Sequence, residues 1–96
     1  MTVYTLPAEL TVYTVNDTYQ HLVDTLTTAS GIVIIEAHAV EEIDGCGIQL
    51  LTYFASQCQE KNTYFQCDNP SESLKEAAKL LNVSTILFPL DEGIEA

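Results

Sequence analysis

Hydrophobic and polar residues alternate along the chain with two periods, one typical of strands and one typical of helices. The segment 2–6 alternates and stops at Pro7, so it predicts an opening strand. The next apolar residues recur mostly at steps of three and four: Val12, Val15, Tyr19, Leu22, Val23 and Leu26. This spacing predicts a helix that is capped by Thr11 and ends near Thr28. The apolar, β-branched run 32–35 then predicts a strand covered on both faces.

The second half of the chain repeats this alternation. A helix is predicted over 47–60, with Leu50 at the edge of a core-facing stripe made of Ile48, Leu51, Phe54, Ala55 and Cys58. A strand over 63–67 follows. The last clear helix closes near Asn82 and carries the apolar residues Leu74, Ala77, Ala78 and Leu81. Residues 83–90 predict a short strand or a packed tail, and 91–96 an acidic terminus.

Strands and helices in strict alternation predict one α/β domain over residues 1–90. We expect a mostly parallel sheet of four to five strands flanked by helices, with a brief extra strand around Leu10. Sites in such sheets collect beyond the carboxyl ends of the strands. The turns Asp44–Gly47 and Asp68–Pro70 both lie at such ends, so we expect them to be neighbours.

The turn before the second helix is the most distinctive stretch. Asp44 is placed to cap the helix, where its charge also suits the positive end of the helix dipole. Gly45 and Gly47 are expected to permit a sharp turn from strand to helix. Cys46 lies between them, so a thiol is predicted at a helix N-terminus.

The composition of the chain limits the functions that it can have. With 3 Lys+Arg against 14 Asp+Glu, the net charge of −11 argues against nucleic-acid and anionic-membrane surfaces. No membrane span or signal peptide is evident, which predicts a cytoplasmic protein. The 3 cysteines form no CxxC pair, and the 2 histidines, His21 and His38, are far apart in sequence. We therefore expect no metal, no cofactor and no catalytic residue.

The segment Ile43-Asp44-Gly45-Cys46-Gly47-Ile48, after a strand and opening a helix, resembles the Asp-Ser-Ser-Gly or Asp-Thr/Ser-Ala-Gly motif of STAS domains. These are small α/β modules of the anti-sigma-factor-antagonist type. The agreement extends to Leu6–Leu10 and to Asn69–Leu74, and it covers about residues 3–88. The resemblance implies partner binding rather than catalysis. In the antagonists a partner kinase phosphorylates the second serine of the motif; lipid-transport relatives contact an ABC-type ATPase, and others resemble chemotaxis accessories.

The motif departs from the phosphorylation switch. Gly45 stands in place of the first hydroxyl residue, and Cys46 occupies the phospho-acceptor position. A thiol is not a plausible substrate for a serine kinase, although the binding surface could persist. The expected partner is a regulatory kinase or ATPase, a chemotaxis component or an ABC ATPase. Self-association remains open.

The outward face of the second helix completes the expected surface. It carries Gln49, Thr52 and Tyr53 and has no charge between Asp44 and Glu60. Interfaces deplete charge and enrich tyrosine, so this face is the candidate docking surface, although a neutral surface without function is an alternative. Two other functions remain as alternatives. One is a sensor that binds a nucleotide or anion at the helix N-terminus, and the other is a thiol-redox enzyme built on Cys46.

Overall fold

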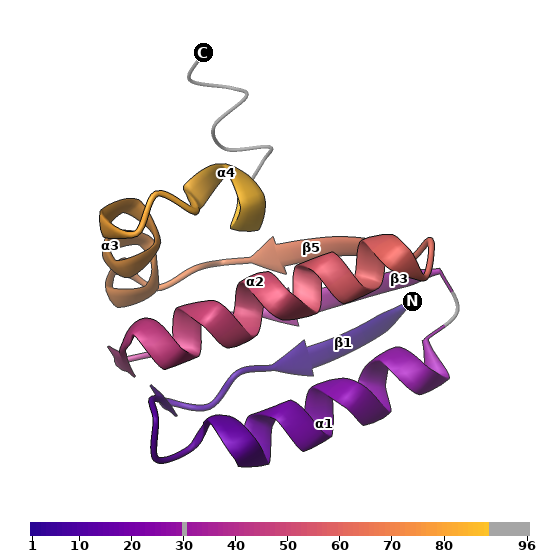
Figure 1. Cartoon of the computed structure of the whole chain (residues 1–96), viewed down its shortest axis with the longest axis horizontal. Helices are drawn as coiled ribbons and strands as arrows, with labels where there is room; N and C mark the ends of the chain where they lie inside the picture. Colours follow the sequence, from indigo (N-terminus) through magenta and orange to yellow (C-terminus); the bar gives the residue numbers. More distant parts are fainter. Residues whose placement is uncertain (30, 89–96) are drawn as a thin grey trace.

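The structure, a computed structural model, describes residues 1–29 and 31–88. Strands and helices alternate, which confirms the predicted α/β class (Figure 1). The elements are β1 (Thr2–Thr5), β2 (Glu9–Leu10), α1 (Val15–Thr28), β3 (Ile32–Glu36), β4 (Glu42–Ile43), α2 (Gly45–Glu60), β5 (Tyr64–Asp68), α3 (Glu72–Leu80) and α4 (Ser84–Leu87). The predicted tail, 91–96, lies outside the described residues.

All strand pairs found in the described part of the chain are parallel, but they form two sheets. The larger sheet has the order β1-β3-β5, with Tyr4 opposite Ile35 and Ile35 opposite Cys67. The smaller pairs β2 with β4, which places Leu10 opposite Ile43. The brief strand around Leu10 is therefore confirmed. Its partner β4 was not predicted, because two residues are too few to show an alternating pattern.

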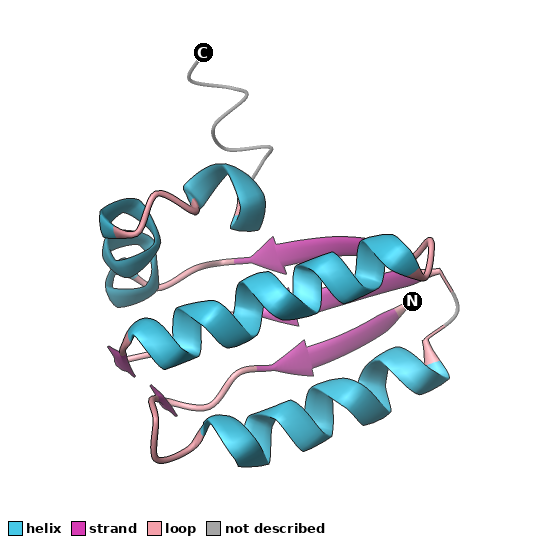
Figure 2. Cartoon of the chain, in the orientation of Figure 1, coloured by secondary structure: helices cyan, strands magenta, loops and turns pink. Residues whose placement is uncertain are grey.

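The carboxyl ends of β1, β3 and β5 lie at the same end of the molecule, where α1, α2 and α3 begin (Figure 2). The loops that lead from the strands into these helices gather at this end. Helices α1 and α2 run side by side along the sheet and contact each other (Figure 1). Because the parallel strands lead into helices at their carboxyl ends, three helix N-termini lie at this edge of the sheet, as the order of elements predicts.

The core lies between the helices and one face of the larger sheet. Fully buried side chains come from every layer: Leu22 of α1, Val33 and Ile35 of β3, Leu51 and Cys58 of α2, and Leu74 of α3. The opposite sheet face is open, because Val3, Ile32 and Tyr64 are 59%, 41% and 51% exposed. The prediction that 32–35 is covered on both faces is therefore wrong for the outer face. An apolar run alone does not distinguish a central strand from one with a half-exposed face.

Several predicted boundaries shift. Helix α1 starts at Val15, with Thr14 rather than Thr11 at its N-cap position, so Val12 lies before the helix and is exposed. Helix α2 starts two residues earlier than predicted. Helix α3 ends at Leu80, and Leu81 is exposed rather than buried. The expected strand or tail after residue 83 contains the short helix α4, whose Leu87 is fully buried.

Candidate partner-binding surface

Asp44 connects two segments that are distant in sequence. Its Oδ1 accepts a hydrogen bond from the backbone N–H of Gly47 at 3.1 Å, which confirms the predicted helix cap. Its Oδ2 accepts a second bond at 2.9 Å from the N–H of Val12, in the loop before α1. The N–H of Val12, followed by that of Gly47, holds the pKa of the Asp44 carboxyl below its usual value. The carboxylate thus fixes that loop against the start of α2.

The two glycines of the motif have different roles. Neither has a positive φ, so the expected unusual backbone angles are absent. A Cβ on Gly47 would overlap the carbonyl oxygen of Leu10 and would lie 2.9 Å from Cγ1 of Ile43. A Cβ on Gly45 would meet nothing within 4 Å. Gly47 is therefore required by the close approach of α2 to β2, whereas Gly45 is not required by space.

The loop before α1 exposes two residues that the sequence pattern does not place on the surface. Thr11 donates its N–H to Thr14 Oγ1 at 2.9 Å, and that hydroxyl donates to the Glu9 carbonyl at 3.0 Å. The resulting tight turn leaves Val12 and Tyr13 55% and 89% exposed. The periodicity had placed Val12 on the buried helix face. Tyr13 does not belong to the apolar residues at helical spacing, and this is the feature of the sequence that indicates its exposure.

The outward face of α2 lies where the sequence predicts. Gln49 is exposed, Thr52 is half-buried, and Tyr53 is 50% exposed. The ring of Tyr53 packs against that of Tyr19 from α1, with 6.4 Å between centroids. Cys46 is half-buried in the first turn of α2, with a free thiol. Asp44, the glycine turn and this helix face therefore form one continuous stretch of α2, beside the Val12–Tyr13 loop.

The other two cysteines, Cys58 and Cys67, differ from Cys46 in their position. Cys58 is fully buried in α2, as predicted, and burial raises the pKa of its thiol to about 11. Cys67 lies in β5 opposite Ile35. Neither belongs to the first turn of α2.

A second polar group lies at the carboxyl ends of β3 and β5. The amide of Asn69 donates to both carboxylate oxygens of Glu36, at 2.9 and 3.2 Å, and His38 Nδ1 lies 3.3 Å from Glu36 Oε1. The Asn69 bond, aided by His38, lowers the pKa of Glu36 against the opposing effect of burial. Glu36 is thus a structural link between β3 and the loop after β5. This arrangement contains no nucleophile.

The acidic residues near the turn line a groove of about 450 Å³ between β4 and α3. Asp44 and Ile43 lie on one side and Ala77 on the other, with Glu41, Glu42 and Glu76 among the lining residues. Helix α3 therefore lies beside the Asp44 turn, whereas the groove contains no residue of Asp68–Pro70, so the expected contact between these two turns stays a prediction. Within residues 1–29 and 31–88, no group of three His, Cys, Asp or Glu side chains is placed to hold a metal ion.

No helix in the described part of the chain has the length and apolar character needed to span a membrane. No curated protein matches the sequence significantly. The chain resembles the crystal structure of a sulfate transporter family protein from Wolinella succinogenes, with a TM-score of 0.74 and 20% identity. That match covers 91% of this chain and 70% of the other, and at this identity it shows the fold alone. A family model described as STAS domain matches residues 1–95. The chain, with its glycine turn between strand and helix, therefore belongs to the STAS domain family.

Proposed function

We propose that this chain is a cytoplasmic, non-enzymatic regulatory module that binds a kinase or ATPase partner in bacterial signalling. The binding surface comprises the turn Asp44–Gly47, the helix-face residues Gln49, Thr52 and Tyr53, and the loop residues Val12 and Tyr13. We call these residues the docking surface. The observation that carries the proposal is the double hydrogen bond of Asp44, which holds the exposed loop against the start of α2.

The docking surface has the composition of an interface centre. Protein interfaces are rich in tyrosine and poor in charge at their centres. Here Tyr13 and Tyr53 are exposed by 89% and 50%, and α2 carries no charged residue from Gly45 to Gln59. Fixing Val12 through its backbone also limits the conformational freedom that the loop loses on binding. Composition and preorganisation thus favour the same surface.

The acidic groove beside the docking surface indicates which charge the partner should carry. Glu41, Glu42 and Glu76 line it, next to Asp44. A partner with basic residues around an uncharged contact region would be attracted to this end of the molecule. We therefore expect association to slow as salt is raised, because rim charges act mainly on the association rate.

The residue at the phospho-acceptor position sets the mode of regulation. Cys46 offers a thiol where the family motif has a serine hydroxyl. Our proposal therefore excludes release of the partner by serine phosphorylation at this position, and it retains binding by the surrounding surface.

Affinity capture from cells of the source organism, with the intact chain as bait, would supply the partner for a direct test. Amide hydrogen exchange of the chain would then be compared with and without that partner. We expect slower exchange over 12–14 and 45–53, and unchanged exchange in β5. A captured signalling kinase supports the proposal, whereas an ABC-type ATPase would replace the signalling role. Unchanged exchange over both segments would refute the docking surface itself.

A further inference from the structure

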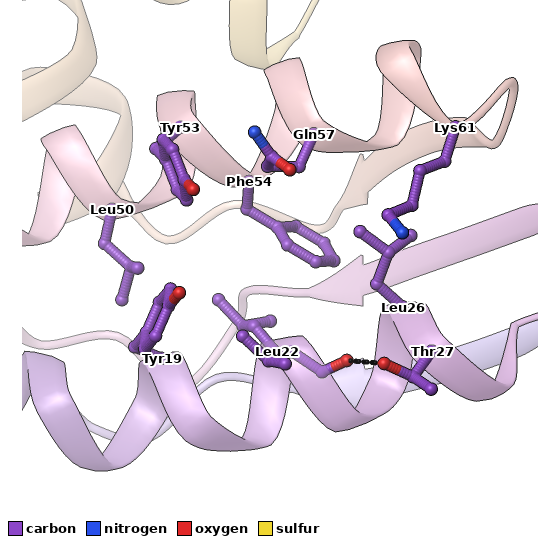
Figure 3. A pocket seen from close by; sticks show the side chains of 10 residues that line it. Tyr19, Leu22, Leu26, Thr27, Leu50, Tyr53, Phe54, Gln57 and Lys61 are labelled. Atoms are coloured by element: carbon purple, nitrogen blue, oxygen red, sulfur yellow. Dashed lines mark hydrogen bonds between the residues drawn. The ribbon is translucent and has the colours of Figure 1, made fainter.

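A groove of about 180 Å³ lies between α1 and α2, outside the turn of the family motif. Its floor is apolar, because Leu22, Phe54 and Leu50 are 1%, 4% and 9% exposed. Val23 and Leu26 of α1 also line it. Figure 3 shows the labelled apolar side chains converging from the two helices, with Tyr19 and Tyr53 facing each other at one end. The groove thus has an apolar body that two helices hold in place.

The other end of the groove carries a positive charge. Lys61 follows the last residue of α2, and its side chain reaches towards Leu26 of α1 (Figure 3). Among the described residues Lys61 makes no ion pair, whereas Lys75 pairs with Glu72 at 3.3 Å. The nearby Thr27 hydroxyl already donates to the Val23 carbonyl at 2.9 Å. Lys61 is therefore the available cationic donor at this end.

This charge is unusual for the chain. The protein has 14 acidic residues and 3 lysines, yet none of the described residues lining this groove is acidic. Ligand sites typically combine apolar walls with a few polar groups that fix orientation. Here the one charged lining residue is a cation at the end of an apolar groove. That pattern is complementary to an anion with an apolar chain.

We propose that the groove between α1 and α2 binds a small amphipathic carboxylate. Its apolar chain lies against Leu22, Leu26 and Phe54, and its carboxylate pairs with the Lys61 ammonium. An apolar cavity of about 150 Å³ holds a six-carbon ring. The slightly larger volume of about 180 Å³ therefore fits about six to eight carbons. Tyr53 belongs to both this groove and the docking surface, but the inference does not depend on the protein partner proposed above.

Chain length should dominate the affinity. Each buried methylene strengthens binding by about fourfold until the groove is filled. Lys61 is exposed, so its ion pair should contribute only about two- to fivefold. A ligand of about ten non-hydrogen atoms is then expected to bind with a Kd of about millimolar.

The test is an NMR titration of the ¹⁵N-labelled chain with butanoate, hexanoate, octanoate and decanoate. We expect amide shifts to concentrate on 19–27 and 50–61, and affinity to rise up to octanoate. Octan-1-ol, with the same chain and no charge, should bind more weakly, and octylammonium weaker still. Absence of shifts in these two segments with octanoate would overturn the proposal, and so would equal binding of octylammonium.

Two variants locate the site. Lys61→Met removes the charge and should weaken octanoate binding about two- to fivefold, whereas Lys79→Met, on the exposed side of α3, should leave it unchanged. Val23→Phe should fill the groove and abolish binding, with circular dichroism confirming the fold. Equal octanoate affinity in the parent and both groove variants would overturn the assignment. A dimer in sedimentation velocity that Val23→Phe dissociates would instead assign the groove to a second copy.

Discussion

Replacing Gly47 by alanine should destabilise the fold through a steric clash that involves Leu10. The added Cβ would overlap the Leu10 carbonyl oxygen and crowd Cγ1 of Ile43. Leu10 is fully buried and belongs to β2, which pairs with β4, so its carbonyl has little freedom to move. The helix must shift instead, and that shift pulls Asp44 away from Val12.

The magnitude follows from two opposing effects. Alanine is a better helix former than glycine by about 0.5–1 kcal/mol. Overpacking a tight contact costs about 1–3 kcal/mol, and a backbone obstacle favours the upper part of that range. We therefore expect Gly47→Ala to lower the free energy of unfolding by about 1–2 kcal/mol. Valine should cost more, because its branched side chain adds bulk at the same contact.

Gly45→Ala is the matched control, since it makes the same chemical change two residues earlier in α2, where a Cβ meets nothing within 4 Å. We expect its stability to equal or exceed that of the parent. Urea unfolding followed by circular dichroism would give both midpoints, and an unchanged slope would show that the shifts report stability. A Gly47→Ala midpoint at or above that of Gly45→Ala would refute the close-contact explanation.

Three further predictions follow from the same residues. The folded-state pKa of Asp44 is lowered, so its charge contributes stability above the unfolded value of about 4, and this contribution is lost as pH falls through the folded pKa. Asp44→Asn should therefore unfold more easily at pH 7, and a difference in urea midpoint that did not narrow as the pH fell below 4 would contradict this. Iodoacetamide at pH 8 should modify Cys46 in the native protein and Cys58 only after unfolding, because burial raises the pKa of the latter to about 11; equal rates in peptide mass spectra would count against it. A kinase specific for STAS antagonists should leave the parent chain unmodified and phosphorylate Cys46→Ser, so a kinase-dependent phosphate on Cys46 itself would disprove the loss of the acceptor.

Local sequence signals predicted which face of α2 points outward. The stripe containing Ile48, Leu51 and Cys58 defines the buried face of α2, and this orientation places Gln49 and Tyr53 outside. The Asp44 cap was equally readable, because it depends on an N–H group three residues away. These features depend on helix geometry, so a short stretch of sequence contains them.

Features that depend on distant contacts were not predictable in the same way. The exposure of Val12 follows from the turn before α1 and from its bond to Asp44, 32 residues later. The need for glycine at position 47 arises from the carbonyl of Leu10, which no local pattern places there. The open sheet face escaped prediction because an apolar β-branched run occurs both in covered and in half-exposed strands.

The most direct test of the docking surface compares two tyrosines with nearly equal exposure. Tyr53 is 50% exposed on α2, and Tyr64 is 51% exposed on β5. Glutamate at either position adds the same charge and removes the same ring, and thermal melts would verify that both variants fold. We predict that Tyr53→Glu weakens partner binding at least about fivefold in isothermal titration calorimetry, whereas Tyr64→Glu stays within about twofold of the parent. Equal affinities for the two variants would contradict the assignment of α2 as the binding face.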